Sequence, residues 1–260
     1  MTDELEFSML RLERREDGVR HLILDDPDKR NAIGPLMREE LLDAVAALRA
    51  DADARCLVVS GAGKAFCAGA DLGAIFDNGE RSPARMRERQ LAYYESFLGI
   101  GDLPYPTVAA VDGAAIGAGL NLALVCDVTI AGPRAKFGVT FAKLGLHPGG
   151  GCTYFLTRAV GPGRALRAML LGSVIGGEEA ARIGLAAECV EDPMAAAEEL
   201  ATAVAQLEPS LARDMKQAVS IAADGTLEAA LGFESWAQTA SAFYPGVVEG
   251  IRAAGRSTAR

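Results

Sequence analysis

The sequence predicts an α/β protein whose core is followed by a helical C-terminal segment. Between residues 56 and 131, short apolar segments typical of buried strands end in glycine-rich turns and lead into helical patterns. Strand patterns end at about residue 160, and helical spacing dominates the rest of the chain. The 260 residues, 50% of them hydrophobic, are enough for a sizeable folded core.

The N-terminal elements are a hairpin and an amphipathic helix. Residues 7–13 and 19–24 have strand patterns and are joined by an Asp-Gly pair, a typical hairpin turn. Residues 35–50 repeat apolar side chains at helical spacing, with Pro35 in the first turn. We therefore expect a hairpin followed by a helix that packs on the core.

The following elements alternate and then become helical. Strands are expected at 56–60, 107–111 and 128–131, with helices at 84–99 and 118–125. The C-terminal helices are expected at 163–171, 178–183, 193–206, 209–223 and 226–242.

Composition excludes several classes of function. A formal net charge of −9 argues against general binding to nucleic acid or to anionic membranes. Five cysteines without a Cys-x-x-Cys pair indicate reduced thiols, and only two histidines argue against a metal site. The acidic N-terminus lacks an apolar signal core, and no apolar run is long enough to span a membrane. We expect a cytoplasmic protein.

Two glycine turns carry the chemical interest of the sequence. They comprise residues 63–72 and 112–121, and each follows a buried strand and leads into a helix. Neither matches a phosphate-binding motif, because Val58 and Ala65 break the P-loop pattern and the second turn lacks G-x-G-x-x-G spacing. Unpaired N–H groups from both turns, converging on one point, would form an oxyanion hole. Taken alone, however, they are better explained as two tight turns that glycine makes possible.

Further motifs accompany these turns along nearly the whole chain. They are Asp-Pro-Asp-Lys-Arg-Asn-Ala at 26–32, Lys-Ala-Phe-Cys-Ala-Gly-Ala-Asp-Leu at 64–72, 113–127, Phe137, Leu-Gly-Leu at 144–146, Pro-Gly-Gly-Gly at 148–151, 156–161 and Glu-Gly-Ile-Arg-Ala at 249–253.

In this order and spacing the motifs resemble the crotonase (enoyl-CoA hydratase/isomerase) superfamily. The resemblance implies a crotonase-like spiral of ββα units with a C-terminal helical trimerisation region. It divides the chain into an acyl-CoA-binding core at 1–195 and an oligomerisation region at 196–260, assembled as a homotrimer or a hexamer built from two trimers. The ligand it implies is an acyl-CoA thioester, with coenzyme A as part of the substrate and no separate cofactor.

The resemblance also implies site residues. The main-chain N–H groups of Ala68 and Ala118 would form the oxyanion hole, where one preorganised donor contributes about 10²–10³ in rate. The other implied substrate-binding positions are Lys29, Arg30, Ala32, Ala70, Asp71, Leu72 and Phe141. The two basic residues are equally explained as solvated loop charges, and Asp71 as a helix cap. The acyl-pocket segment would hold Phe76, Met86, Tyr93 and Tyr94, although core packing also explains each of them.

The acids that a hydratase of this family needs are missing. Asn121 and Phe141 occupy the two glutamate positions, and Gly149 occupies the position of an isomerase carboxylate. Because a positioned acid or base contributes roughly 10²–10⁴ in rate, ordinary hydration is doubtful. Phe141 would instead make the acyl pocket drier.

Other side chains are candidates to replace these acids. His147 is the histidine near the site, and histidine is the side chain that ordinarily titrates near neutrality. A loop residue that fixes the backbone is nevertheless the stronger explanation for it. Asn121 could hold a water or a substrate carboxylate, or merely begin a helix, and Thr140 could donate a hydrogen bond.

Three functions stay open at this point. The first is an enzyme of fatty-acid metabolism acting on acyl-CoA thioesters, either a hydratase by family likeness or a decarboxylase or thioesterase by site chemistry. The second is a non-catalytic acyl-CoA-binding protein. The third is a structural partner in a trimer.

Overall fold

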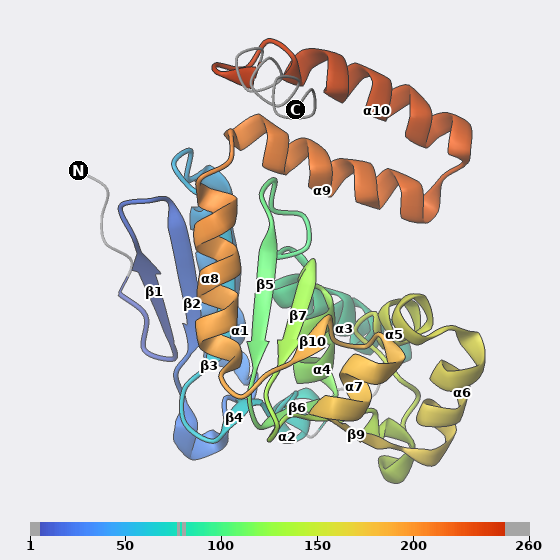
Figure 1. Cartoon of the computed structure of the whole chain (residues 1–260). Helices are drawn as coiled ribbons and strands as arrows, with labels where there is room; N and C mark the ends of the chain where they lie inside the picture. Colours follow the sequence, from blue (N-terminus) through green and yellow to red (C-terminus); the bar gives the residue numbers. More distant parts are fainter. Residues whose placement is uncertain (1–5, 77–78, 80–81, 248–260) are drawn as a thin grey trace.

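Two sheets form the framework of the structure, which is a computed structural model describing residues 6–76, 79 and 82–247 (Figure 1). The large sheet contains, in spatial order, β1 (Leu10–Arg14), β2 (Val19–Leu24), β3 (Cys56–Gly61), β5 (Thr107–Val111), β7 (Val128–Ala131) and β10 (Glu188–Cys189). The small sheet contains β4 (Ala65–Cys67), β6 (Ala114–Ile116), β8 (Lys136–Gly138) and β9 (Val174–Gly176).

The chain winds between these sheets as a spiral. It passes from β3 to β4, from β5 to β6 and from β7 to β8, and each passage leaves the large sheet for the small one. Strands β3, β5 and β7 are parallel neighbours, as are β4, β6 and β8, so each turn of the spiral adds one strand to both sheets. The predicted spiral of ββα units is confirmed.

Helices cover the sheets and line the ends of the spiral. They are α1 (Pro35–Ala50), α2 (Leu72–Phe76), α3 (Pro83–Leu98), α4 (Ala118–Leu124), α5 (Cys152–Val160), α6 (Pro162–Leu171), α7 (Gly177–Ile183), α8 (Pro193–Ala205), α9 (Pro209–Asp224) and α10 (Leu227–Ser241). Helix α1 matches its predicted bounds, and the proline at its first position is preorganised for a helix start.

Both faces of the large sheet are buried. Leu57 and Val59 of β3 belong to the main core, whereas Cys56 and Val58 belong to a second core under α8. Side chains alternate between the two faces of a strand, so a strand covered on both sides is apolar throughout. This explains the continuous apolar run that predicted β3.

The C-terminal helices separate into two groups. Helix α8 lies across the large sheet, while α9 and α10 form a hairpin at one end of the molecule (Figure 1). The predicted boundary after residue 195 therefore falls inside α8, which is part of the core. Lys216 ties α9 to the core, because its Nζ lies 2.9 Å from Asp127 Oδ2 and donates to the carbonyl oxygen of Tyr105.

Some elements differ from the sequence predictions. Strands β9 and β10 lie beyond residue 160, where strands were expected to end. Strands β4, β6 and β8 and helix α5 were not predicted; each of these strands has three residues, too few to show a strand period. The motif at 249–253 lies outside the described residues.

Two searches over the described residues gave negative results. None of the described helices is both long and apolar enough to cross a membrane. Within the same residues, no three His, Cys, Asp or Glu side chains gather as a metal site would require.

Asn31 fastens the early loop to the first glycine turn. Its fully buried amide nitrogen donates to the carbonyl oxygens of Ala62, Ala65 and Phe66, and its Oδ1 accepts from the Asp26 amide. Its φ of 57° lies in the left-handed region, which asparagine tolerates better than most residues. One side chain therefore joins three segments beside the site.

We expect Asn31→Ala to destabilise the fold. The substitution leaves buried main-chain groups without partners, which costs about 2–3 kcal/mol of unfolding free energy. Denaturant titration measures this quantity. A loss below about 0.5 kcal/mol, within the range of an ordinary surface substitution, would show that Asn31 does not hold these segments together.

Candidate active site

The two glycine turns meet beside the start of α4. A β-carbon on Gly69 would lie 2.5 Å from the Ile116 carbonyl oxygen and 3.6 Å from the Ala118 nitrogen. A β-carbon on Gly119 would overlap the carbonyl oxygen of Cys67. Only glycine at both positions lets the two main chains approach so closely. The contact places the segment that follows Gly69 next to the first amide of α4.

The prediction that the Ala68 amide is an oxyanion-hole donor is wrong. This amide donates to the carbonyl oxygen of Arg30 at 2.9 Å and is therefore already used within the chain. Sequence reasoning could not tell which amide of this turn faces the early loop.

Ala70 offers the free amide instead. Ile33 donates to the Gly69 carbonyl and accepts from the Asp71 amide, in a parallel bridge centred on Ala70. In such a bridge the N–H of the central residue points away from its partner strand. Within the described residues, no hydrogen bond occupies the Ala70 amide.

The Ala118 amide is a second main-chain N–H without a hydrogen-bond acceptor within the described residues. Ala118 begins α4, so its N–H has no acceptor within the helix. Gly117 precedes it with φ 56° and ψ −111°, a conformation in the left-handed half of the map that favours glycine. Ala70 and Ala118 line the same cavity. An oxyanion hole requires two such N–H groups directed at one point.

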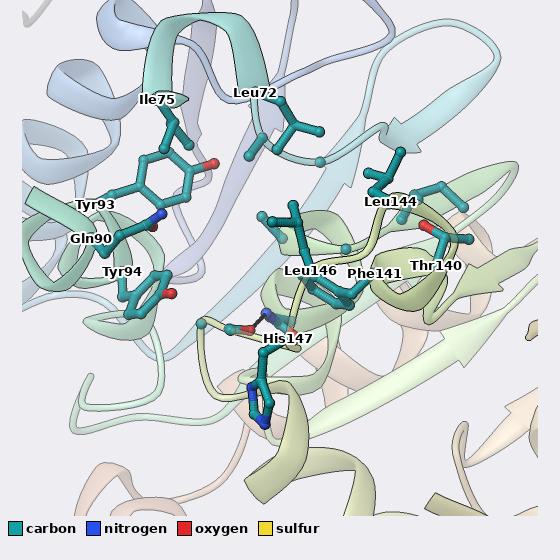
Figure 2. Close-up of a pocket in the computed structure, with 18 of the residues that line it drawn as sticks. Leu72, Ile75, Gln90, Tyr93, Tyr94, Thr140, Phe141, Leu144, Leu146 and His147 are labelled. Carbon is teal, nitrogen blue, oxygen red and sulfur yellow. Dashed lines mark hydrogen bonds between the residues drawn. The ribbon is translucent and has the colours of Figure 1, made fainter. Parts of the chain in front are cut away.

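This cavity has a volume of about 170 Å³ and mostly apolar walls (Figure 2). Leu72, Ile75, Phe141 and Leu146 form much of these walls. No aspartate or glutamate is found among the lining residues within the described part of the chain. The polar side chains that line the cavity are Gln90, Tyr93, Tyr94, Asn121, Thr140 and His147.

Asn121 is buried in the wall of the cavity, and only one end of its side-chain amide has a hydrogen-bond partner. Its side chain is 1% exposed, and its Nδ2 donates to the Gly149 carbonyl oxygen at 2.8 Å. A carbonyl can only accept, so this bond fixes which end of the amide is nitrogen. The other end, Oδ1, is buried without a hydrogen-bond partner.

Phe141 and Tyr94 place their rings against two glycines of the site, Gly117 and Gly149. The Phe141 ring comes to 3.7 Å from the place of a β-carbon on Gly117. A β-carbon on Gly149 would overlap the Tyr94 hydroxyl oxygen and lie 3.2 Å from Tyr94 Cζ. The sequence analysis assigned Tyr94 to an acyl-pocket segment. Nothing in the sequence indicates that Tyr94 contacts Gly149.

His147 lies at the edge of the cavity. Its side chain is exposed, and its ring points away from Tyr93 and Phe141 in Figure 2. Its Nδ1 lies 2.7 Å from the Pro148 carbonyl oxygen and must be the donor of that bond. In the neutral ring, Nε2 is then the nitrogen with a free lone pair. It belongs to a side chain at the rim of the cavity and not to one in its wall.

The other predicted binding residues lie at different depths. Leu72 and Phe141 line the cavity, whereas Lys29 and Arg30 are exposed and lie outside it, as does Ala32. Asp71 Oδ1 accepts from the Ala74 amide and caps α2. Asp71 and Met86 line a neighbouring cavity, and the side chain of Phe76 lies outside the described residues.

The buried thiols and Tyr93 do not suit acid–base work at neutral pH. Burial raises the pKa of Cys67 to about 12 and that of Cys152 to about 11, so both remain thiols. Burial also raises the pKa of Tyr93, whose hydroxyl donates to the Ile33 carbonyl. The site therefore relies on main-chain amides and neutral side chains.

Known proteins resemble this chain in sequence and in fold. The family described as enoyl-CoA hydratase/isomerase matches residues 14–251. A probable enoyl-CoA hydratase, EchA14 of Mycobacterium tuberculosis, is 51% identical over 180 residues, 69% of each chain. The 1,2-epoxyphenylacetyl-CoA isomerase of Escherichia coli is 35% identical over 227 residues, covering 84% of this chain and 85% of the isomerase. The crystal structure of a Bacillus anthracis enoyl-CoA hydratase matches with a TM-score of 0.86 and 28% identity, covering 96% and 97% of the two chains.

The contact between Tyr94 and Gly149 predicts a rescue. Gly149→Ala must displace the Tyr94 hydroxyl and should lower stability, whereas in a Tyr94→Phe background the oxygen is gone and the loss should shrink. A double-mutant cycle of unfolding free energies should give a coupling of at least about 0.5 kcal/mol. Additive effects of the two substitutions would show that the hydroxyl does not fill this space.

Proposed function

This chain belongs to the enoyl-CoA hydratase/isomerase family, and we propose that it binds an acyl-CoA thioester and polarises the thioester carbonyl with the amides of Ala70 and Ala118. The observation that carries the proposal is that these two free N–H groups line one apolar cavity. The acyl chain would lie against Phe141 and Leu146, with the carbonyl oxygen between the two amides.

The chemistry of such a site follows from where charge develops. Reactions beside a thioester build negative charge on the carbonyl oxygen, and fixed amide donors stabilise that charge without reorganisation. Each donor contributes about 10²–10³ in rate. Binding and polarisation therefore need no ionised side chain in the wall.

Ordinary hydration requires ionisable side chains, because a base must activate the water and an acid must protonate the α-carbon. Asn121 and Phe141 cannot exchange protons, and each missing group removes roughly 10²–10⁴ in rate. We expect hydration of crotonyl-CoA to be far slower than the roughly 10 s⁻¹ of a typical enzyme.

The neutral wall favours one further reaction class, decarboxylation of a 2-carboxyacyl thioester. The bond from the α-carbon to the carboxylate breaks, its electron pair passes to the thioester oxygen as an enolate, and CO₂ leaves. The enolate then takes a proton from water. No base is required, and without a carboxylate in the described lining nothing repels the anionic substrate. A non-catalytic acyl-CoA-binding role is the alternative if no reaction is found.

Thioester binding, hydration and decarboxylation can each be measured separately. Calorimetry should detect butyryl-CoA binding, the hydration assay should show at most a marginal rate, and CO₂ release from malonyl-CoA and methylmalonyl-CoA tests decarboxylation. Hydration within about tenfold of typical enzymes would contradict the role given to Asn121 and Phe141. Absence of binding to every thioester would contradict the proposal itself.

The donor role of Ala118 has its own test. Ala118→Pro removes the N–H and places ring carbons where the carbonyl oxygen would lie, while proline is well tolerated at the first residue of a helix. We expect butyryl-CoA affinity to fall at least about tenfold, because the variant loses a hydrogen bond to the thioester carbonyl and the proline ring clashes with its oxygen. Ala118→Gly keeps the amide and is the matched control. Equal affinities in the two variants, both shown to be folded by circular dichroism, would exclude this donor.

We also propose that the chain self-associates through its C-terminal helices, as a trimer or a pair of trimers in the cytoplasm. Large apolar side chains on α9, on α10 and just after α10 are more than half exposed, which is unusual for a free surface. They are Met215, Val219, Leu227, Leu231, Trp236 and Phe243.

Charge introduced on α10 should separate the subunits. The double variant Leu231→Glu/Trp236→Glu should elute as a monomer, with the mass determined by light scattering, whereas the wild type should have three or six times the monomer mass. Leu36→Glu changes an exposed leucine on α1 and should leave the assembly intact. A monomeric wild type would contradict the proposal.

A further inference from the structure

A second cavity adjoins the acyl cavity. It has a volume of about 190 Å³ and is lined by residues of α1, α2 and α3 and of the segments that precede α1 and α2. Ile75, Gln90 and Tyr93 line both cavities, and Figure 2 shows these three residues together on one side of the acyl cavity. The two cavities therefore meet along these residues, and a ligand that fills the first lies next to the second.

The second cavity differs from the acyl cavity in charge. Its described lining contains Arg38, Arg89 and Asp71, whereas no Lys, Arg, Asp or Glu is found in the described lining of the acyl cavity. Positive charge therefore exceeds negative charge in this place, although the whole chain has a formal net charge of −9. Asp71 is also engaged elsewhere, because its Oδ1 accepts from the Ala74 amide. This local excess of positive charge suits an anionic group.

Arg38 reaches the second cavity from α1. Its Nε donates to the carbonyl oxygen of Ala92 at 3.4 Å, and Ala92 lines the same cavity, so the guanidinium lies where α1 faces α3. The residue is half-buried, and its two terminal nitrogens have no hydrogen-bond or ion-pair partner within the described part of the chain. A half-buried positive charge without a counter-charge is costly, and an anion bound beside it lowers that cost.

Arg89 reaches the second cavity from α3. Met86, Arg89 and Tyr93 follow one another at helical spacing and all line the cavity, so they belong to one face of this helix. The Arg89 side chain is exposed, and it forms no ion pair with any described residue. Two arginines from different helices, neither with a carboxylate partner among the described residues, thus line one cavity.

We propose that Arg38 and Arg89 bind a carboxylate at the far end of the acyl chain, so that the protein selects CoA thioesters of dicarboxylic acids. The chain runs from the thioester carbonyl through the acyl cavity and past Ile75, and its terminal carboxylate lies in the second cavity. This inference rests on the proposed thioester binding and names the class of acyl group.

The chemistry of the two groups explains the selection. A guanidinium is planar and always charged, and it binds a carboxylate with two parallel N–H···O bonds. Such charge-assisted bonds are roughly twice as strong as those between neutral groups. A methyl group at the end of the chain forms no such bond, and it leaves the half-buried Arg38 without a counter-charge. The arginines therefore favour a charged chain end over an apolar one.

Calorimetry with matched pairs of CoA thioesters tests the proposal. Glutaryl-, adipyl- and suberyl-CoA are each compared with the monocarboxylic thioester of the same carbon number, which is pentanoyl-, hexanoyl- or octanoyl-CoA, in the full-length protein. We expect at least one dicarboxylic thioester to bind at least about tenfold more tightly than its counterpart, as a hydrogen bond between charged groups predicts. Because salt screens the attraction of exposed charges, the preference should shrink at high salt.

Three variants locate the source of the preference. Arg38→Met and Arg89→Met keep an unbranched side chain and remove the charge, so each should lower the affinity ratio of the preferred pair at least about threefold. The double variant should bring this ratio close to one. Arg87→Met is the matched control, because it removes an exposed arginine of α3 that does not line the cavity, and it should keep the ratio of the wild type. Circular dichroism checks folding; if Arg38→Met does not fold, the exposed Arg89 still decides the question.

The outcomes separate this inference from the proposed function. Equal affinities within every pair, a ratio that Arg89→Met leaves unchanged, or an equal loss of preference in Arg87→Met overturns the carboxylate site alone. Failure to bind any of the six thioesters overturns thioester binding, and the carboxylate site with it.

Discussion

The approach of two main chains at Gly69 and Gly119 is the contact on which the site depends. Each glycine faces a carbonyl oxygen of the opposite turn, and a β-carbon at either would force the turns apart. Their contact brings the bridge at Ala70 beside the first turn of α4. The bonds that Ala68, Gly69 and Asp71 make with the early loop then leave the Ala70 amide as the one directed elsewhere. Packing geometry, rather than any reactive side chain, thus creates the proposed donor pair.

The length of each element and its pairing partners decided which features could be predicted from the sequence. Helix α1 was predictable because its apolar residues recur at helical spacing over many turns. Strands β3, β5 and β7 were predictable because each is a continuous apolar segment. The small sheet was not, since β4 and β6 are short and lie within segments that look like turns. The choice of Ala68 over Ala70 failed for a related reason. The direction in which each amide of this turn points depends on its pairing with residues 30–33. The sequence of the turn itself does not reveal that pairing.

Among site residues, motif order located Ala118, Asn121 and Phe141 correctly in one cavity, because they lie on or near α4 and the loop that follows β8. Tyr94 could be assigned only to a segment, since its partner Gly149 is 55 positions away and lacks a side chain that would mark the contact. His147 shows the opposite case. Its residue type suggested catalysis, but its exposed ring and its bond to Pro148 place it at the rim.

The described lining of the cavity contains neutral groups and no carboxylate, and this limits what the cavity can do. Its apolar wall and free amides suit binding and polarisation of a carbonyl, while proton transfer lacks a strong base in the described lining. Asn121 is the clearest example, because its amide donates one hydrogen bond to the loop at Gly149 and cannot exchange a proton. The fold is that of the family.

Infrared spectroscopy of a thioester labelled with ¹³C at its carbonyl tests the central claim most directly. If the amides of Ala70 and Ala118 hold the oxygen, the carbonyl stretching frequency of bound butyryl-CoA should fall below that of the free thioester. A bound ligand whose carbonyl frequency equals that in water, or rises as in an apolar solvent, would show that the two amides do not meet at the carbonyl.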